Sequence, residues 1–439
     1  MSETNSAVYS DANKTPPMSE ALPLGLQHVL AMFASNVTPS IIVAGAAGLA
    51  FGGAEQVYLI QMAMLFAGIA TLFQTVGFGP IGARLPIMQG TSFAFVGVLA
   101  GIAATQGLSV ALTSCIIAGL VHFALGSVIV RIRSWFPPLV TGLVILAIGL
   151  YLIPVGIKYA AGGAADFQMA ADSFGSLQHW SVALTVIVVS LVVKFKTNGI
   201  LSNAAILIGL VAGYVLAYAL GMVSFGGVAK ASWITGLQVL PYGFEFNLGA
   251  VIGVILVSIV SAVETVGDVS ATTKAGAGRE ATDAEISGAT YADGLGSAVA
   301  GVFGGLPNTS FSQNVGIVSM TGVMSRHVVT IAGVIMLLCG LLPKVGAIIA
   351  SMPFPVLGGG VIVMFGMVAA AGMNVLSEVS MNRRNMIIIA ISLTVGLGLN
   401  LEPSAVQHLP GIWKTLATSA VAPTAFLAIF LNQILPDEG

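Results

Sequence analysis

Long apolar segments, separated by short polar connections, fill most of the 439-residue chain. A helix that crosses a membrane needs about 20 mostly apolar residues. The pattern therefore predicts an all-α polytopic membrane protein with fourteen transmembrane spans, numbered here in chain order: 24–45, 54–76, 86–105, 107–130, 136–156, 178–195, 199–224, 247–273, 284–304, 308–323, 327–349, 354–374, 384–401 and 412–434.

Two of these spans contain nearly the same short motif, which begins with Thr-Ser-Phe. TSFAFVG (91–97) lies in span 3, and TSFSQNVG (309–316) lies in span 10. Threonine and aromatic residues favour extended backbone. Irregular backbone at membrane depth is tolerated only where it is buried in protein or lines a cavity. We therefore predict a short extended break, followed by a half-length helix, in each of the two spans. Two kinked packing helices are the simpler alternative.

The two motifs belong to a longer repeat. They lie 218 residues apart, and FPPLVTGLVILAIG (136–149) matches PFPVLGGGVIVMFG (353–366) at an offset of 217 residues. Two matches at nearly one offset predict two related halves of seven spans each. Because seven is odd, the second half would cross the membrane in the opposite direction, as inverted repeats of secondary transporters do. Chance similarity between apolar segments is the alternative.

Composition supports the membrane prediction. The chain is 56% hydrophobic and only 7% charged, with a mean hydropathy of +0.99, whereas soluble domains carry about 25% charged residues. A net charge of −2 gives no basis for a nucleic-acid partner. Cys115 and Cys339 lie in apolar segments and are expected to be packing residues. Residues 1–22 lack the layout of a signal peptide and are expected to form an unstructured N-terminal tail.

Charge also predicts an orientation. If the N-terminus is cytoplasmic, eleven of the fifteen lysines and arginines lie on the cytoplasmic side, including every arginine. The outer loops then hold only Lys158, Lys230, Lys344 and Lys414. This asymmetry is the positive-inside bias of membrane proteins. We expect both termini to be cytoplasmic, in a multi-pass protein of the inner or plasma membrane.

Three acids fall inside predicted spans, where ionisable groups are costly and usually functional. They are Glu264 and Asp268 in span 8 and Asp293 in span 9. Glu264 and Asp268 are four residues apart and share one helix face. Two carboxylates this close, away from water, do not both ionise readily, which suits a group that binds and releases a proton. A structural pair bonded to neighbouring hydroxyl groups is the alternative.

Other polar and aromatic residues at the breaks could contact a ligand. Gln313 offers an amide carbonyl and two N–H donors in one plane, which fits the edge of a planar molecule. Phe93 could stack on a flat ligand. Asn314 and His28 are candidates with a strong structural alternative, because polar side chains also join neighbouring membrane helices.

These residues carry a resemblance to the nucleobase–ascorbate transporter family. QNVGIVSMTG (313–322) fits the family signature: Gln, Glu or Pro, then Asn, any residue, Gly, four of any residue, Thr, and Arg, Lys or Gly. ETVGDVSAT, ADG, the QH of span 1, QGTSF and NRR are similar to further family features. The resemblance extends over about residues 20–434 and points to the bacterial xanthine and uric acid permeases.

The resemblance implies a fold in which a core domain moves against a gate domain in each protomer of a homodimer. The core would comprise spans 1–4 and 8–11, and the gate spans 5–7 and 12–14. The corresponding boundaries are a cytoplasmic tail at 1–22, core segments at 23–130 and 236–350, and gate segments at 131–235 and 351–439.

The resemblance also implies residue roles. Glu264 would accept hydrogen bonds from ring N–H groups of a base, and Gln313 would contact another polar edge. Backbone around Phe93 and Ser312 would complete the site, and Ser92 would bear on the choice between xanthine and uric acid. Support for transport and proton coupling would come from Asp268, Asp293, Asn314 and His28.

The expected function is proton-coupled import of purine bases, xanthine or uric acid or both. No enzymatic activity, cofactor or resident metal is expected, and sodium stays open as an alternative coupling ion. Rival functions are a uracil or other nucleobase symporter and a sulphate-permease-like anion transporter. An intramembrane aspartyl protease is disfavoured, because Thr265 stands where the first glycine of a GxGD motif belongs.

Overall fold

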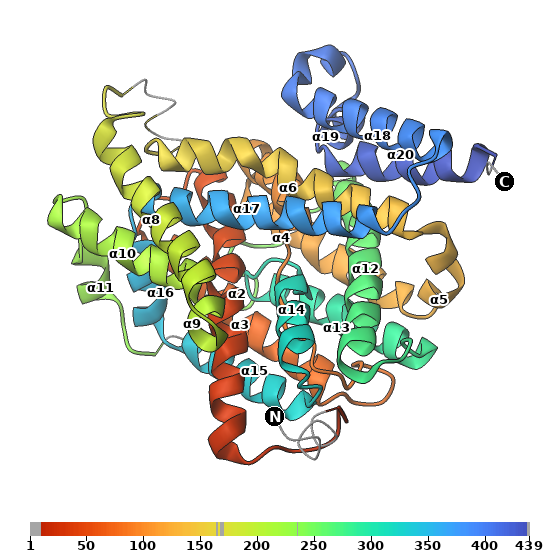
Figure 1. Ribbon diagram of the computed structural model, residues 1–439. Coiled ribbons are helices and arrows are strands. Elements are labelled where there is room, and N and C mark those ends of the chain that lie inside the picture. Colours follow the sequence, from red (N-terminus) through yellow and green to blue (C-terminus); the bar gives the residue numbers. More distant parts are fainter. Residues whose placement is uncertain (1–9, 164–165, 167–170, 235, 437–439) are drawn as a thin grey trace.

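The computed structural model describes residues 10–163, 166, 171–234 and 236–436. Helices dominate this part of the chain (Figure 1). The first half contains α2 (Met18–Ala46), α3 (Ala54–Thr75), β1 (Gln89–Thr91), η1 (Phe93–Phe95), α4 (Val96–Leu125), α5 (Ile129–Ile132), η2 (Arg133–Trp135), α6 (Pro138–Ala160), α8 (Leu177–Lys196), α9 (Gly199–Asn203), α10 (Ala205–Ala219) and α11 (Gly226–Lys230).

The second half has a comparable sequence of elements. It contains α12 (Leu248–Ala277), α13 (Asp283–Val302), β2 (Asn308–Ser310), α14 (Ser312–Thr321), α15 (Arg326–Leu341), α16 (Pro343–Ala350), α17 (Phe354–Ser377), α18 (Arg383–Leu401), η3 (Pro403–Val406), α19 (Gly411–Ala417) and α20 (Val421–Ile434). In the described ranges, eight helices are long and apolar enough to cross a membrane, or nine if a bent pair forms one span. The prediction of an all-helical polytopic protein is confirmed at this level.

Both predicted breaks contain extended backbone. β1 and β2 pair antiparallel, with Gly90 opposite Thr309, and form a two-stranded ribbon. β1 leads through η1 into α4, and β2 leads directly into α14. The ribbon thus joins two segments that lie far apart in the sequence.

Glycine and proline divide helices at one predicted span boundary and also inside two predicted spans. Gly107 has φ 89° inside α4 and separates this helix into two parts, as expected between spans 3 and 4. Span 11 was predicted as one helix, but α15 and α16 meet at an angle of 80°. Pro343 begins α16, and because proline lacks an N–H and restricts the residue before it, α15 cannot continue through it.

Span 14 is also divided. α19 ends at Ala417 and α20 begins at Val421, with Ala420 between them at φ 59°. Pro423 lies in the first turn of α20, where the missing N–H removes no intrahelical bond. A continuous helix would instead lose a hydrogen bond at Pro423 and meet a steric clash.

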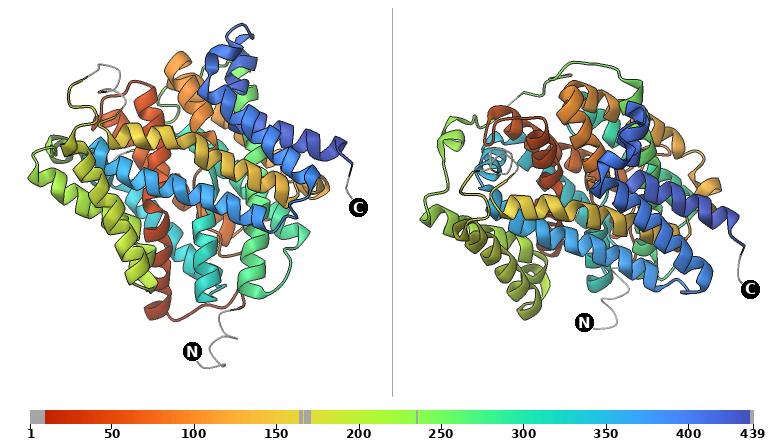
Figure 2. Two further views of the ribbon diagram at one scale, coloured as in Figure 1. Left: turned by 45° about the horizontal axis from the view of Figure 1, so that its top comes forward. Right: turned by 90° about the horizontal axis from the view of Figure 1, so that it is seen from above.

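Small residues allow the longest helices to pack closely. α6 and α17 lie side by side in all views (Figures 1 and 2). A Cβ placed on Gly149 of α6 would lie 2.4 Å from the backbone nitrogen of Ala369, and one on Gly372 of α17 would lie 2.4 Å from that of Leu146. α3 packs on α15, and α4 packs on α13. Any larger side chain at these glycines would force the helix pairs apart.

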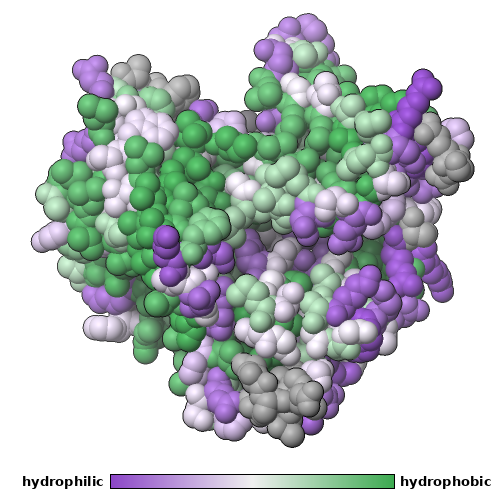
Figure 3. All heavy atoms as spheres, in the orientation of Figure 1, coloured by the Kyte–Doolittle hydropathy of each residue, from purple (hydrophilic) through white to green (hydrophobic). Residues whose placement is uncertain are grey.

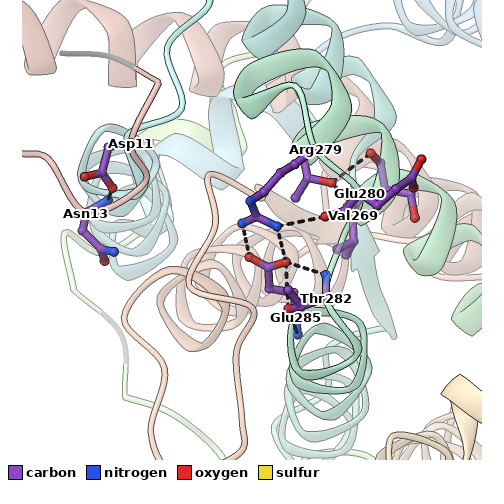
Figure 4. Close-up of polar contacts among 9 residues, drawn as sticks. Asp11, Asn13, Val269, Arg279, Glu280, Thr282 and Glu285 are labelled. Atoms are coloured by element: carbon purple, nitrogen blue, oxygen red, sulfur yellow. Dashed lines mark hydrogen bonds and ion pairs between the residues drawn. The ribbon is translucent and has the colours of Figure 1, made fainter. Parts of the chain in front are cut away.

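The connection between α12 and α13 is fixed by polar contacts (Figure 4). Thr282 caps α13 and Glu285 returns a hydrogen bond to the Thr282 backbone, which forms a capping box. Arg279 contacts both carboxylate oxygens of Glu285. The hydrogen bond from Arg279 to Glu285 raises the pKa of the Arg279 guanidinium. The two helices that carry Glu264, Asp268 and Asp293 are therefore joined by a defined turn.

The described end of the N-terminal tail is attached to the helices, contrary to the expectation of an unstructured segment. Arg326 N–H donates to the Ala12 carbonyl at 3.0 Å, and Ser325 Oγ donates to the Lys14 carbonyl at 2.6 Å. α2 begins at Met18, six residues before the predicted start of span 1. Residues 10–17 therefore lie against the connection that follows α14.

Large apolar side chains cover much of the outer surface. Figure 3 shows hydrophobic residues over α8, α10 and α17, and a hollow with hydrophilic residues near the centre of the same face. On α8, Leu177 is 89% exposed and Phe195 is 80% exposed. A water-soluble protein would not expose such a surface, whereas lipid chains would cover it.

Candidate functional site

The β1–β2 ribbon is held at the centre of the molecule by side chains of α2 and α12. Asn36 Oδ1 of α2 accepts the backbone N–H of Thr91 at 2.8 Å, and Asn36 Nδ2 donates to the Ala63 carbonyl. Ser261 of α12 donates to Thr309 Oγ1 at 3.2 Å. All four polar residues are buried. The extended breaks therefore have a fixed position between the helices.

A cavity of about 180 Å³ lies beside this ribbon. One wall comes from the two breaks and α12, and the opposite wall comes from α6 and α17. Its lining residues are Thr91, Phe93, Ala94, Ile145, Ile148, Glu264, Thr309, Ser310, Phe311, Ser312, Gln313, Met367, Val368 and Ala371. The cavity combines apolar surfaces with a few polar groups at one side, as small-molecule sites commonly do.

Four predicted ligand contacts meet at this central cavity: Glu264, Gln313, Phe93 and Ser312. Glu264 is partly buried, and its carboxylate has no hydrogen-bond partner in the part of the chain that the structure describes. Gln313 lies in the first turn of α14. A carboxylate acceptor and an amide group are thus available at one small cavity.

Asp268 lies one turn beyond Glu264 on α12, and the second break holds its carboxylate. Ser310 Oγ donates to Asp268 Oδ2 at 2.6 Å, and Ser312 Oγ donates to Asp268 Oδ1 at 2.8 Å. Asp268 is 7% exposed. It does not line the central cavity, although it lines the larger neighbouring one.

Asp293 of α13 lies behind the ribbon and joins three other elements. Its Oδ1 accepts hydrogen bonds from Gln74 Nε2 of α3 at 2.9 Å and from Gln89 Nε2 of β1 at 2.6 Å. Its Oδ2 accepts a short hydrogen bond from Thr265 Oγ1 of α12. Asp293 is fully buried, and these contacts make it a junction behind the site.

His28 and Asn314 form a second buried contact behind the site. Asn314 Nδ2 lies 3.0 Å from His28 Nδ1 and donates to the His28 carbonyl at 3.0 Å. This pair joins α2 to the first turn of α14, next to Gln313. Neither residue lines the central cavity.

Ser92 and Phe93 have different positions despite being neighbours. Phe93 lines the central cavity, and its ring meets Phe365 of α17 edge-on at 5.4 Å between centroids. Ser92 is 2% exposed and lies outside the lining, with its backbone N–H bonded to the Pro307 carbonyl. Its buried Oγ has no hydrogen-bond partner among the described residues.

A larger cavity of about 700 Å³ adjoins the central one and shares Ile145, Glu264, Ser312 and Ala371 with it. It also reaches Arg133, the last two turns of α12 at Lys274, and Glu378 after α17. The hollow in Figure 3 lies in the same region, between α17 and the α12–α14 pair. The central cavity therefore has an approach from one end of the molecule.

The positions of several polar residues were not predicted from the sequence. Asn36, Gln74, Gln89 and Thr265 all help to hold the ribbon or Asp293. Each is a polar residue in an apolar segment, and this was the one sequence feature that indicated a buried polar contact. Their partners come from other helices, so the sequence pattern could not connect them.

The fold and the site define a class: a multi-pass membrane permease whose small central cavity lies between broken helices. Comparisons with known proteins identify the family. A family model described as "Permease family" (Xan_ur_permease) matches residues 19–404. The chain belongs to this family of nucleobase–ascorbate transporters.

The relatives are purine permeases by name. The chain is 38% identical over 414 residues to a Clostridium perfringens protein provisionally described as a purine permease, covering 94% of this chain and 90% of that one. It is 32% identical to the xanthine permease XanP of Escherichia coli (99% and 96% covered) and 36% identical to the uric acid permease PucK of Bacillus subtilis (93% and 94% covered).

Solved structures with the same fold have far lower sequence identity. The transmembrane domain of the cyanobacterial bicarbonate transporter BicA superposes with a TM-score of 0.62 at 15% identity, covering 94% of this chain and 97% of that one. Murine Slc26a9, an anion transporter solved in the inward-facing state, gives 0.61 at 14% identity, covering 94% and 68%. At these identities the likeness concerns the fold alone.

Proposed function

We propose that this permease imports xanthine, uric acid or both across the cell membrane together with protons. The observation that carries the proposal is the meeting of Glu264 and Gln313 at one cavity, in a chain whose relatives are named xanthine and uric acid permeases. A carboxylate and an amide complement the alternating N–H and C=O groups on the edge of an oxidised purine.

In this proposal the central cavity binds the base between the two walls. Glu264 accepts ring N–H groups, Gln313 contacts another polar edge, and the backbone at Phe93 and Ser312 completes the polar contacts. The Phe93 ring packs against the ligand. Its edge-on contact with Phe365 holds the ring in position for this packing. Ser92 acts from behind Phe93, by setting the position of the first break.

Proton coupling is assigned to the acids of α12. Glu264 and Asp268 are one turn apart, and only Asp268 has hydrogen-bond donors in the described chain, from Ser310 and Ser312. We infer that Glu264 takes up the coupled proton when the base binds and that Asp268 assists its transfer. Asp293, Asn314 and His28 support transport by holding the breaks.

Helix packing supports the proposal of two inverted seven-span repeats. In this scheme α2 corresponds to α12, α3 to α13, the two parts of α4 to α14 and α15, α6 to α17, α8 to α18 and α10 to α20. Contacts then occur in matching pairs: α3 packs on α15 as α13 packs on α4, and α8 packs on α10 as α18 packs on α20.

The same correspondence supports separate core and gate domains. We propose core segments at 23–130 and 236–350 and gate segments at 131–235 and 351–439. The central cavity lies between them, since β1, β2, α12 and α14 belong to the core and α6 and α17 to the gate. Rocking of the core past the gate would then expose the cavity to each side in turn, the cycle expected of such folds.

We further propose that the larger cavity faces the cytoplasm, because Arg133 and Lys274 line it and basic residues favour that side. Both termini would be cytoplasmic, and the described state would be the one that releases the base. A homodimer is proposed from the family resemblance. The resemblance and composition give no role to a metal, cofactor or nucleic acid.

An anion carrier is the second candidate, because the solved structures with this fold transport bicarbonate or other anions. Facing helix N-termini at the breaks would suit an anion. The carboxylate of Glu264 at the cavity opposes this, since it would repel one. A uracil symporter keeps the same mechanism and differs only in the ligand.

The test is uptake of radiolabelled xanthine in cells that lack their own purine permeases. We expect uptake that a protonophore abolishes and that unlabelled uric acid blocks, while uracil and sulphate do not. Uptake that persists with the protonophore but requires sodium would show that sodium, and not the proton, is the coupling ion. No uptake of xanthine or uric acid by well-expressed protein would contradict the proposed substrate class.

A further inference from the structure

Tyr151 makes an unusual contact between α6 and the start of α4. Its hydroxyl oxygen accepts the backbone N–H of Gly97 at 2.9 Å, and its O–H donates to the Phe93 carbonyl at 3.3 Å. Residues 93 and 97 are the i and i+4 positions that an α-helical turn would join directly. The hydroxyl therefore lies between the two partners of a helical hydrogen bond.

This contact is tightly built. Tyr151 is 8% exposed, and a Cβ on Gly97 would lie 2.9 Å from its Cε2 atom, so glycine is needed for the close approach. The Phe93 carbonyl also accepts the N–H of Val96, a 3₁₀ bond that tightens the first turn. Side chains that insert into the helical ladder are a recognised cause of altered helix geometry.

The contact lies beyond the central cavity, on the side away from the larger cavity. Along α6, Pro138, Thr141 and Ile145 line the larger cavity, and Ile148 lines the central one. Tyr151 follows one turn later. It lines neither cavity and instead contacts the first turn of α4. Phe365 of α17 adds an edge-on contact to the ring of the same Phe93.

We propose that the Tyr151 hydroxyl is a conformational clip. It holds α6 to the first turn of α4 while the central cavity is open toward Arg133 and Lys274, and it releases that turn when the cavity opens the other way. After release, the Gly97 N–H can bond the Phe93 carbonyl directly, so neither group loses a partner. The clip rests on the alternating cycle of the proposed function and adds a residue that couples the gate to the ligand-contacting Phe93.

The test compares Tyr151→Phe with Tyr159→Phe. Tyr159 is a matched control, since it lies on the same helix, is 5% exposed, and makes no hydrogen bond through its hydroxyl in the described chain. The reporter is Ala371→Cys, which lines both cavities, in a chain with Cys115→Ser and Cys339→Ser. A membrane-impermeant maleimide is applied to right-side-out and to inverted vesicles.

Tyr151→Phe is expected to lower the ratio of labelling from the larger-cavity side to labelling from the opposite side by roughly three- to ten-fold, the effect of one buried hydrogen bond. Tyr159→Phe should leave the ratio unchanged. Equal ratios for the two tyrosine variants would overturn the clip. If Tyr151→Phe does not fold, Gly97→Ala, which displaces the ring, should shift the ratio in the same direction, and an unchanged ratio there would overturn it too.

This readout is independent of the ligand, because labelling requires no purine. A carrier without xanthine uptake could still show the shift, in which case the proposed substrate would fail and the clip would stand. If purine uptake occurs and the labelling ratio is unchanged, the clip fails and the proposed substrate stands.

Discussion

At the scale of single residues, position relative to the ribbon separates ligand contacts from supporting residues. Glu264 lines the cavity without a hydrogen-bond donor in the described chain, whereas Asp293 accepts three side-chain hydrogen bonds and lies behind the site. Two acids from adjacent spans therefore have different environments. A free acceptor can serve a ligand, while a fully bonded one fixes structure.

Glu264→Gln is expected to reduce proton-coupled uptake at least ~100-fold, because the amide cannot take up a proton and presents an N–H where the base needs an acceptor. The protein level in the membrane should be nearly normal, since the side chain holds no partner in the described structure. Initial rates of radiolabelled xanthine uptake, normalised to protein by immunoblot, are the measurement.

Glu378→Gln is the matched control for this variant. Glu378 lines only the outer part of the larger cavity, and its replacement should leave uptake within about two-fold. Normal transport by Glu264→Gln would remove this residue from both ligand binding and coupling.

At the scale of elements, caps and breaks place the functional helices. Prolines divide α15 from α16 and set the start of α20, and the paired strands hold the starts of α4 and α14 together. The turn between α12 and α13 matters most, because these helices carry Glu264, Asp268 and Asp293. Its capping box is the local feature that fixes where α13 begins after α12.

Glu285→Gln should destabilise the protein by about 1 kcal/mol, because it removes the negative charge at the start of α13 and the contact of Arg279 with two carboxylate oxygens. The amide oxygen can still accept the Thr282 N–H, so the capping box itself is retained. Thermal unfolding in detergent, followed by the loss of the monodisperse peak, measures the effect. Glu280→Gln is the control, since its ion pair with Lys274 is exposed, at 75% and 65% of the side chains, and such pairs contribute little. Equal midpoints for the two variants would show that the turn does not stabilise the helix pair.

At the scale of the whole molecule, the distribution of charge and the cavities predict which end faces the cytoplasm. Arg133 and Lys274 line the larger cavity, and Lys274 lies in the last turn of α12. The connection between α11 and α12 leads into the opposite end of α12, which begins at Leu248. In the proposed orientation this connection is extracellular. The direction of import depends on this assignment.

Single cysteines at Glu378 and Trp233 test the orientation in the chain without Cys115 and Cys339. Trp233 is 72% exposed on the predicted outer side. An impermeant maleimide should label Trp233→Cys in intact cells and Glu378→Cys only after permeabilisation. The reverse result would place the larger cavity outside and make the described state the one that accepts the base.

The sequence by itself determined the membrane class, the family, the all-helical architecture and the positions of both breaks. These depend on local properties: apolar length, small residues and proline, and a signature read from 313–322. Local preference was enough because a lipid environment demands internally bonded helices wherever an apolar segment crosses it.

Only the tertiary structure decided which polar residues meet. The antiparallel ribbon joins segments 218 residues apart, and the partners of Asp293 come from α3, β1 and α12. Likewise, nothing in the sequence around Tyr151 indicates a partner for its hydroxyl. The structure places this hydroxyl beside Gly97. Side-chain partners depend on how helices cross and rotate, and that geometry is set by packing across the whole molecule, which no local pattern records.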